Sequence, residues 1–429
     1  MSKEISIGLL GSGTVGTGVV RVLKENADDI AKKVGGRIAI KKILVRDISK
    51  KREYLEDIQL TDNADDILND PEIDIVVELL GGQHPAREYM LKAMENGKHV
   101  VTANKDVVAQ FGHDLFDMAE AKGVDFKFEA SVGGGIPIIT PLKECLTGNR
   151  ISEIMGIVNG TTNYMLTKMT EDGSDYASIL KEAQAMGYAE ANPAADVEGW
   201  DAARKAVILA SIGFNTRINL EQVSVEGITH IEPADINYAN ELGYVIKLLA
   251  VAKDYGEKGV NVRVHPVFLP SSHPLAAVKD VFNAIFLRGN AIGDAMFYGR
   301  GAGSLPTASA VVADIIGEAR NIVSDVHSVI GCTCYNSRAF CPIEETESSY
   351  YVRLHVDDEP GVLGSIATAF GESGVSLKSV IQTRKVGRHA EIVAVTHVVQ
   401  HRNLQKAADV LQGLKVVDSI RSIIRVEEN

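Results

Sequence analysis

The residues best placed for chemistry lie in the segment GYAEANPAADVEGWDAARK, which ends at Lys205. Asp201 and Lys205 stand four residues apart, so on a helix they share one face, and the apolar run after Lys205 leads that helix into a core. A carboxylate and an amine at the edge of a core can bind a small zwitterion and transfer a proton. The alternative is an ordinary surface ion pair, worth about 0.3–0.5 kcal/mol. The other acids of this segment are Glu190, Asp196 and Glu198, and Arg204 has no assigned task.

A glycine-rich turn, GSGTVG at residues 11–16, follows an apolar strand-like run and precedes a long helical pattern. In this context Gly11 permits a tight turn, Gly13 lets the backbone approach a pyrophosphate, and Gly16 lets the helix pack close to the sheet. Backbone N–H groups at the helix start, including those of Thr14 and Val15, face the phosphates. The turn therefore predicts a dinucleotide site, with a purely structural turn as the alternative.

The end of the second strand, near residue 45, should meet the adenosine ribose of that dinucleotide. Arg46 comes first and Asp47 follows it. Arginine suits a 2′-phosphate, so the sequence favours NADP, with Lys50 and Lys51 nearby to assist. The alternative is that Asp47 binds the ribose hydroxyl and the cofactor is NAD.

A lysine and two further glycine loops complete the candidate residues. Lys105 follows the strand-like segment 99–102, and ligands of open α/β sheets bind at the carboxyl ends of strands. We therefore expect Lys105 near the nicotinamide and the substrate, although a surface lysine that begins a helix would look the same. The glycines of 129–136 and of 299–303 indicate backbone with unusual dihedral angles. A bare hinge and a simple connector are their alternatives.

The elements that must position these residues alternate between strand and helix over residues 1–130, which predicts a parallel sheet with helices on both faces. This is the Rossmann-type dinucleotide-binding domain. Residues 131–305 read as an α+β domain for substrate binding and dimerisation, and a helix over 304–325 should pack back on the first domain. Residues 331–348 read as a linker. Residues 349–429 follow the order βαββαβ, the ferredoxin-like plan.

Composition narrows the class of protein. The chain has 429 residues, 45% of them hydrophobic, and a net charge of −13. That charge argues against nucleic acid or an anionic membrane as the main partner. We find no secretion signal and no apolar run of about 18 residues, so we expect a cytoplasmic protein with no membrane partner. The Cys332-x-Cys334 spacing is too tight for the usual zinc pair, which favours free, reduced thiols.

Several long motifs resemble those of homoserine dehydrogenases, in the expected order over about residues 1–330. They are GLLGSGTVG, VTANK, EASVGGGIPII, NGTTNYML, GYAEANPAADVEGWDAARK and GRGAGSLPTASAVV. The C-terminal segment, with DDEPGVL at a strand–helix turn, resembles an ACT domain, a small amino-acid-sensing module. The arrangement is similar to bacterial enzymes of this family that are not fused to an aspartate kinase.

The resemblance implies reversible hydride transfer between L-homoserine and L-aspartate 4-semialdehyde with NAD(P), in the synthesis of threonine, methionine and isoleucine. Lys205 matches the proton donor and acceptor, and Lys105 the second active-site lysine. Glu190 and Asp201 match the acids that hold the substrate, and Gly303 matches a cofactor contact. The resemblance also implies a monovalent cation site, usually sodium. Its expected ligands are Glu129, Val132, Gly134 and Ile136.

For the ACT domain we expect amino-acid sensing, with threonine as the effector by analogy with the pathway. The helix after Pro360 offers backbone N–H groups to an amino-acid carboxylate. The alternative is a module that only dimerises. ACT domains commonly pair, so a homodimer or homotetramer is expected. Two other functions stay open at this stage: a dehydrogenase for a different amino acid or semialdehyde, and a non-catalytic nucleotide and amino-acid sensor.

Overall fold

The computed structural model describes residues 4–326, 330–386 and 389–427. The chain folds into two compact units. Unit 1 comprises residues 1–158, 204–222 and 282–337, and unit 2 comprises residues 159–203, 223–281 and 338–429. These units do not coincide with the expected domains, whose bounds stay a prediction. Among the described residues, no helix is long and apolar enough to cross a membrane.

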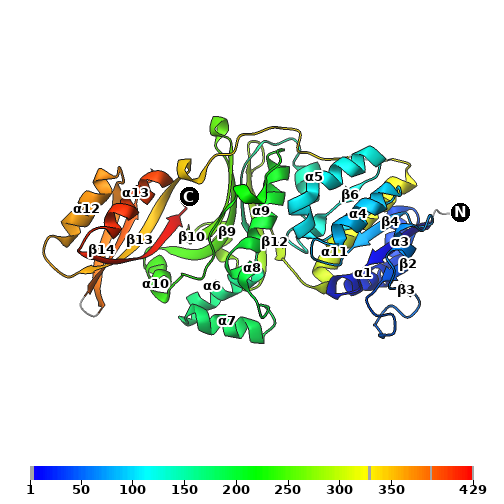
Figure 1. The fold of residues 1–429 in the computed structure, drawn as a ribbon, viewed down its shortest axis with the longest axis horizontal. Helices are drawn as coiled ribbons and strands as arrows, with labels where there is room; N and C mark the ends of the chain where they lie inside the picture. Colours follow the sequence, from blue (N-terminus) through cyan, green and yellow to red (C-terminus); the bar gives the residue numbers. More distant parts are fainter. Residues whose placement is uncertain (1–3, 327–329, 387–388, 428–429) are drawn as a thin grey trace. The chain divides into compact units, whose positions relative to one another are not determined.

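Unit 1 is built around a six-stranded parallel sheet in the order β3-β2-β1-β4-β5-β6 (Figure 1). This is the strand order of a Rossmann-type fold, as the sequence predicts. The strands are β1 (Glu4–Leu10), β2 (Arg37–Leu44), β3 (Gln59–Thr61), β4 (Ile75–Glu78), β5 (His99–Thr102) and β6 (Phe126–Lys127). Short β3 is absent from the sequence prediction, since three residues are too few to show a period.

Helices cover this sheet and supply its core. They are α1 (Thr14–Glu25), α2 (Ala27–Val34), α3 (Asp65–Leu68), α4 (Ala86–Glu95), α5 (Lys105–Lys122) and α11 (Ser304–Val323). The long helical pattern after the glycine turn predicts one helix that ends near Gly35. The structure has two helices instead, because the chain breaks at Asn26, which is both the C-cap of α1 and the N-cap of α2. Apolar side chains of α11, among them Val311 and Ile315, share one buried cluster with Ile7 of β1. The late helix thus packs against the N-terminal sheet.

The rest of unit 1 holds three antiparallel strands in the order β12-β11-β7. They are β7 (Ile151–Ile157), β11 (Phe282–Gly289) and β12 (Gly293–Arg300). Short helical turns lie at Glu129–Ser131, Pro141–Cys145 and Leu220–Gln222. Helix α9 (Trp200–Gly213) begins in unit 2 and continues into unit 1 from Arg204.

Unit 2 contains a sheet in the order β9-β10-β17-β13-β15-β14. Its strands are β8 (Ser224–Val225), β9 (Tyr244–Asp254), β10 (Val260–Pro270), β13 (Glu347–Asp357), β14 (Leu377–Val386), β15 (His389–Thr396), β16 (Val399–Gln400) and β17 (Val417–Val426). Its helices are α6 (Gly160–Asp172), α7 (Tyr176–Ala185), α8 (Ala194–Val197), α10 (Pro233–Glu241), α12 (Val362–Glu372) and α13 (His401–Gln412), with short turns at Gly256–Lys258, Pro274–Ala277 and Ile343–Glu345.

The C-terminal part of unit 2 has the predicted βαββαβ order, from β13 through α12, β14, β15 and α13 to β17. Its strands pair in the antiparallel order β17-β13-β15-β14, and α12 and α13 bury apolar side chains on the sheet (Figure 1). β13 begins at Glu347, inside the stretch 331–348 that reads as a linker. The sequence also predicts that the two middle strands of this part, 377–384 and 390–399, are joined at Gly387, which lies outside the described residues.

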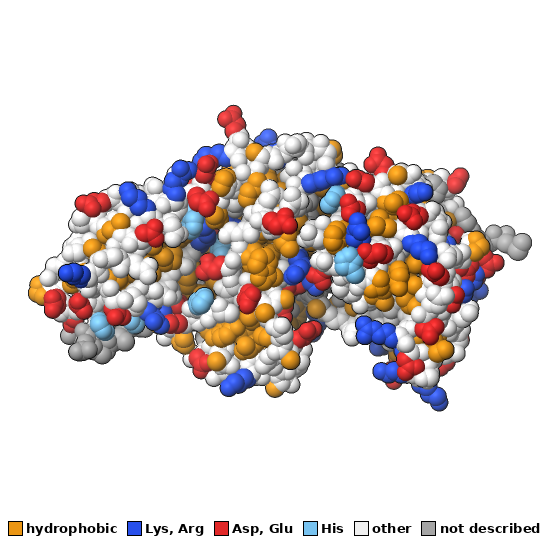
Figure 2. Space-filling view, viewed as in Figure 1, with side chains coloured by type: hydrophobic (Ala, Val, Ile, Leu, Met, Phe, Trp, Pro, Cys, Tyr) orange, Lys and Arg blue, Asp and Glu red, His pale blue; other side chains and the backbone are white. Residues whose placement is uncertain are grey.

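The surface is mixed in charge. Figure 2 shows acidic and basic side chains interspersed over the visible face, with hydrophobic groups between them. The whole chain has 57 acidic and 44 basic residues, and on this face the two signs are not gathered into separate patches.

Candidate active site

The turn between β1 and α1 has a geometry that only glycine accepts. Gly11 has a φ of 108°, and a Cβ at this position would lie 2.9 Å from the carbonyl oxygen of Leu79. A Cβ at Gly16 would lie 2.4 Å from the carbonyl oxygen of Gly11. Contacts this short do not occur, so both glycines are required for the turn to form. The turn brings the start of α1 close to the carboxyl end of the sheet.

The first turn of α1 is open to a ligand. Gly13 is the N-cap and provides no side-chain hydrogen bond to the helix, and a Cβ built on it meets nothing within 4 Å. The N–H groups of Thr14, Val15 and Gly16 therefore begin a helix without a side-chain cap, in a place that a ligand can approach closely. Such a helix start binds phosphate through its N–H groups and its dipole.

The glycine-rich loop 299–303 lies beside the start of α1. Gly303 has a φ of 124° and is the N-cap of α11. The hydroxyl of Ser304 donates a 2.6 Å hydrogen bond to the carbonyl oxygen of Thr14, and a Cβ at Gly18 would lie 2.7 Å from the carbonyl oxygen of Ser304. The loop is thus packed against α1, which favours a cofactor contact at Gly303 over a simple connector.

The end of β2 presents a basic side chain. Arg46 is exposed immediately after the strand. The carboxylate of Asp47 accepts hydrogen bonds of 2.6 and 2.8 Å from the hydroxyl and N–H of Ser49. Those bonds hold the pKa of Asp47 below its ordinary value. Asp47 therefore shapes its own loop, and Arg46 is the side chain that this loop offers to a ligand.

Lys105 begins α5, and a buried network fixes that helix start. The Asn104 side chain accepts a 3.3 Å bond from the N–H of Val107 and donates a 2.7 Å bond to the carbonyl oxygen of Gly82. The Thr102 hydroxyl accepts the N–H of Asn104 and donates at 2.7 Å to the carboxylate of Glu78. Glu78 is fully buried, and burial raises its pKa. The lysine is therefore set on a rigid support at the ends of β4 and β5.

Lys205 lies in α9, and its ammonium donates a 2.7 Å hydrogen bond to the carbonyl oxygen of Val158, at the end of β7. The neighbouring side chain, Arg204, forms a 3.0 Å ion pair with Asp106 of α5. Asp106 directly follows Lys105. One ion pair thus joins the turn that carries one candidate lysine to the turn that carries the other, so the structure gives Arg204 the task that the sequence did not.

The acids that the sequence predicts to hold a substrate lie in unit 2. Asp201, which is 8% exposed, accepts a 2.9 Å hydrogen bond from the side-chain amide of Asn159. The same amide donates at 2.7 Å to Asp196, and the Asn159 side-chain oxygen caps α6 by accepting the N–H of Thr162. Asn159 therefore holds two acids of the motif in place. Glu190 is exposed, and the Gln184 side chain donates to its backbone carbonyl oxygen.

The expected cation loop has its carboxylate in a buried position. Glu129 is 4% exposed and accepts three backbone N–H bonds of 2.6–2.8 Å from residues 138–140. Its own N–H donates at 2.8 Å to Asp314 of α11. Burial and the charge of Glu129 raise the pKa of Asp314 to about 7. Glu129 thus fixes the backbone of residues 138–140, which follow the loop.

The glycines of this loop are needed where it meets the loop 299–303. Gly133 and Gly134 have positive φ angles of 73° and 55°, and a Cβ at Gly134 would lie 2.3 Å from the carbonyl oxygen of Gly301. The N–H of Gly135 donates at 3.0 Å to the carbonyl oxygen of Arg300. The loop is a packed element rather than a bare hinge.

Sequence reasoning missed the residues that hold the site together. They are Glu78, Thr102, Asn104, Asp106, Asn159 and Arg204. Asn159 stands in the motif NGTTNYML, and an asparagine two residues before a helical threonine is a recognisable N-cap signal. Asn104 is likewise the N-cap of α5. The contacts of Thr102 with Glu78 and of Arg204 with Asp106 join segments farther apart in the chain, for which a single sequence gives no signal.

Comparison with known proteins agrees with this geometry. The family model described as homoserine dehydrogenase matches residues 137–316, that of its NAD-binding domain residues 11–129, and that of the ACT domain residues 350–416. The chain is 44% identical to a homoserine dehydrogenase of Bacillus subtilis, over 100% of this chain and 99% of the relative.

Two solved structures are also similar. A homoserine dehydrogenase from Thiobacillus denitrificans has a TM-score of 0.95 at 42% identity and covers 99% of each chain. A hyperthermophilic archaeal homoserine dehydrogenase in complex with NADPH has a TM-score of 0.63 at 26% identity, over 74% of this chain and 98% of the other. Both structures are similar to this chain in sequence and in fold.

Proposed function

The chain belongs to the homoserine dehydrogenase family of NAD(P)-dependent oxidoreductases, and on this premise we propose the residues that carry its reaction. The enzyme interconverts L-homoserine and L-aspartate 4-semialdehyde, within the cytoplasmic synthesis of threonine, methionine and isoleucine. The observation that carries the proposal is the ion pair between Arg204 and Asp106, because it joins the turns that hold Lys205 and Lys105.

Lys205 moves the proton. When the nicotinamide cofactor is bound, it supplies or accepts the hydride. In the reduction direction the aldehyde oxygen becomes an alcohol and needs a proton, which the Lys205 ammonium gives; in oxidation the neutral amine takes it back. The bond from Lys205 to the Val158 carbonyl orients the amine for this task. Lys105 places a second positive charge near the reacting oxygen and stabilises the developing negative charge.

Asp201 and Glu190 hold the substrate, chiefly its ammonium and hydroxyl groups. Support comes from Asn159, whose amide hydrogen bonds fix the carboxylate of Asp201 in one orientation. Asp201 stands one turn before Lys205 in α9, so the residue that anchors the substrate and the residue that moves the proton are carried by a single helix. A rigid helix keeps their spacing constant during turnover.

NADP is the preferred cofactor, with NAD as the weaker one. The uncapped start of α1 after Gly13 fits a pyrophosphate, and exposed Arg46 at the end of β2 fits a 2′-phosphate. Lys50 and Lys51 follow a few residues later and are also exposed, which adds positive charge. The archaeal structure in complex with NADPH supports the same choice by analogy.

Glu129 and the carbonyl oxygens of Val132, Gly134 and Ile136 form a monovalent cation site, most simply for sodium. All four ligands are oxygen atoms, which suits a hard cation. A carboxylate offers about four lone-pair positions. Three of those on Glu129 receive N–H groups, so the donor set fits with one position left.

The ACT domain binds an amino acid, with threonine as the effector. Helix α12 begins after Gly361, which has a φ of 93° and gives no side-chain cap, so the helix start suits a carboxylate. An open cavity of about 530 Å³ lies beside it, lined by residues of α12 together with Val410 and Leu414. Coupling of about 1–3 kcal/mol is enough for useful feedback.

The enzyme is a homodimer or homotetramer. β12 ends the strand order of its sheet and carries large exposed side chains, with Met296 and Tyr298 41% and 54% exposed and Ile292 beside it 44% exposed. An exposed apolar edge strand is a pairing surface, so a second copy of the chain is its simplest cover.

Steady-state kinetics with L-homoserine and each cofactor, with and without threonine, test the proposal. Lys205→Ala should lower turnover by about 10²–10⁴-fold, because the general acid and base is lost, while NADPH affinity measured by fluorescence stays near that of the unsubstituted chain. An equal loss of turnover and NADPH affinity would assign Lys205 to folding instead. Lys253→Ala, on β9 of unit 2, is the matched control and should leave both values unchanged.

A further inference from the structure

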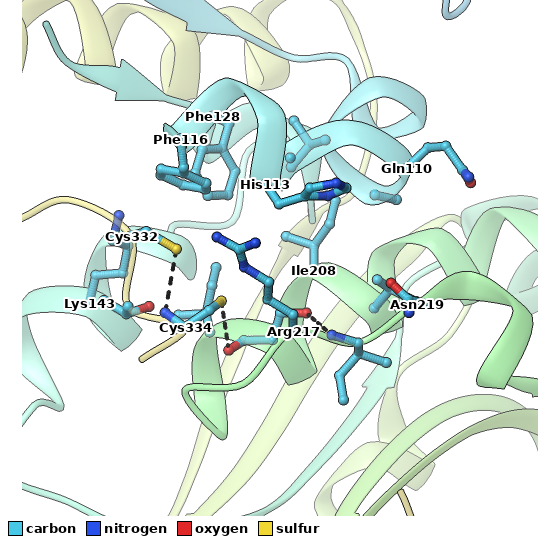
Figure 3. Close-up of a pocket in the computed structure, with 18 residues that line it drawn as sticks. Gln110, His113, Phe116, Phe128, Lys143, Ile208, Arg217, Asn219, Cys332 and Cys334 are labelled. Atoms are coloured by element: carbon cyan, nitrogen blue, oxygen red, sulfur yellow. Dashed lines mark hydrogen bonds between the residues drawn. The ribbon is translucent and has the colours of Figure 1, made fainter. Parts of the chain in front are cut away.

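A cavity of about 280 Å³ lies in unit 1 between residues 108–116 of α5 and residues 207–212 of α9 (Figure 3). Helices α5 and α9 provide two of its walls, and the chain segment 332–334 provides another. Apolar side chains form most of the lining, while three basic side chains also border it. The basic residues are His113, Lys143 and Arg217. A small neutral molecule can therefore enter a partly apolar space that stabilises negative charge.

Two thiols face this cavity. Cys332 and Cys334 are both partly exposed, whereas Cys341 is buried and Cys145 lies on the surface elsewhere. The N–H of Cys334 donates a 3.5 Å hydrogen bond to the sulfur of Cys332, and the Cys334 thiol donates at 3.5 Å to the carbonyl oxygen of Ser211 in α9. All four cysteines are free. The sulfur of Cys332 thus lies over the backbone of Cys334.

Residues two apart in an extended chain have Cα atoms separated by at most about 7 Å, and a disulfide needs about 4.4–6.8 Å. The chain from Cys332 to Cys334 is irregular rather than part of a strand or helix. Closing the pair therefore needs only a local adjustment, without movement of α5 or α9.

The two thiols have different acidities. The neighbouring Cys334 side chain, helped by its backbone N–H and by the charges of Arg217 and Lys143, lowers the pKa of Cys332 to about 6. The same pairing, together with burial, raises the pKa of Cys334. Near neutral pH the pair therefore holds one thiolate, at Cys332, and one thiol, at Cys334. A thiolate in a cationic, accessible place is the reactive form of cysteine.

We propose that Cys332 and Cys334 form a peroxide-reactive dithiol site, in which Cys332 is the attacking residue and Cys334 the resolving one. The Cys332 thiolate attacks one oxygen of hydrogen peroxide; an S–O bond forms, the O–O bond breaks, and the leaving hydroxide takes up a proton to become water. The Cys334 thiol then gives up its proton and attacks the sulfur of Cys332. The S–S bond forms as the S–O bond breaks, and the hydroxyl leaves with that proton as a second water.

The sum is balanced: two thiols and one hydrogen peroxide give one disulfide and two waters. The sulfur atoms lose two electrons and the peroxide oxygens gain them. A dithiol reductant reverses the change by exchange. The dithiol site contains neither Lys105 nor Lys205, and its reaction needs no bound cofactor.

The test oxidises the full-length chain with stoichiometric hydrogen peroxide and maps its tryptic peptides by mass. Cleavage after Arg320 and Arg338 gives one peptide, 321–338, that contains both cysteines of the pair and neither of the others. This peptide should lose about 2 Da, the mass of two hydrogens, and regain it with dithiothreitol. The oxidation rate should rise with pH through a midpoint near 6. A midpoint near 8.5, the ordinary thiol value, would overturn the assignment of Cys332.

Single substitutions separate the two roles. Cys334→Ser should stop at a sulfenic acid on Cys332 that a dimedone-type reagent traps, while Cys332→Ser should slow oxidation of the peptide by at least tenfold. Cys145→Ser, at an exposed thiol outside the cavity, should oxidise like the unsubstituted chain. The proposal fails if Cys332→Ser oxidises at the unsubstituted rate, or if the peptide with Cys145 reacts first. Circular dichroism of each variant excludes unfolding as the cause of any change.

Discussion

The strongest prediction concerns a buried ion cluster that joins the ACT domain to α10. The guanidinium of Arg353 on β13 binds Asp235 at 2.8 Å, Glu391 at 3.0 Å and Glu232 at 2.7 Å. Arg353 and Asp235 are 2% and 0% exposed at their side chains, and Glu391 is 4% exposed. One arginine thus holds three carboxylates, two of them fully out of water.

Arg353→Met keeps the bulk of the side chain and removes the charge. Two buried carboxylates then lose their main partner, although Asp235 keeps the hydroxyls of Tyr351 and Ser422, and Glu391 keeps that of Tyr238. Breaking a buried pair in this way costs about 3–5 kcal/mol of unfolding free energy. For a unit of this size the melting temperature should fall by on the order of 10 °C.

The stability of Arg353→Met should also depend on pH. Burial works against ionisation of Glu391 and Glu232, but hydrogen bonds that include those from Arg353 outweigh it and hold both pKa values below the ordinary one. The stability that these acids contribute is present above pH 4.5 and is lost as the pH falls through their depressed pKa values. Without Arg353 burial prevails at Glu391 and its pKa rises, so the loss of stability relative to the unsubstituted chain is largest near neutral pH.

Thermal unfolding followed by circular dichroism between pH 4 and 7.5 measures the effect. The gap between Arg353→Met and the unsubstituted chain should be widest near pH 7 and should narrow toward pH 4. Arg421→Met is the matched control, because Arg421 pairs with Glu232 at the surface and its loss should change stability by about 1 kcal/mol or less. A melting temperature within about 2 °C of the unsubstituted chain, or a gap that does not change with pH, would refute the reasoning.

Three further predictions concern unit 1. Arg204→Met should lower turnover about tenfold or more, because a small displacement of a reacting group is costly. Its pair with Asp106 is partly exposed, which limits the loss of stability to about 1 kcal/mol. Steady-state kinetics measure turnover and melting curves measure stability, and unchanged turnover would remove the positioning role of Arg204. Arg46→Ala should raise KM for NADPH far more than for NADH in steady-state assays, and an unchanged preference would release Arg46 from phosphate binding. Asp314 has a pKa raised to about 7, so its native form holds a proton that the unfolded chain has lost, and its burial destabilises the fold increasingly as the pH rises from about 4 to 7. Asp314→Asn should remove this slope from urea unfolding between pH 5 and 8, and a slope equal to that of the unsubstituted chain would contradict the pKa.

Local chemistry made much of the fold predictable. The alternation of strands and helices in unit 1 and the βαββαβ order of the ACT domain follow from apolar periods, which are written in contiguous residues. Gly11 and Gly16 are recognisable because a positive φ and a close backbone contact exclude any side chain. The break at Asn26 and the three-residue strand β3 escaped prediction, since neither changes the apolar period over enough residues to be seen.

Sequence motifs also identified the candidate site residues, but only one at a time and without the contacts between them. The sequence names Lys105, Lys205 and Asp201 as reactive groups because a lysine at a strand end and a carboxylate one helical turn from another lysine are chemically unusual. It does not show how each is held. The hydrogen bond from Thr102 to Glu78, the ion pair of Arg204 with Asp106, and the cavity lined by α5 and α9 are absent from any local pattern.

Tertiary structure alone decided which distant side chains meet. Arg204 and Asp106 are almost a hundred residues apart, and Arg353 and Asp235 more than a hundred, yet each pair forms a direct ion pair. Period and turn chemistry are properties of neighbours along the chain, whereas an ion pair depends on the register of two packed elements. The sequence by itself therefore determined most of the secondary-structure elements, the glycine turns and the identity of the candidate reactive residues. Packing determined the contacts that position them, because only the folded chain brings those side chains within bonding distance.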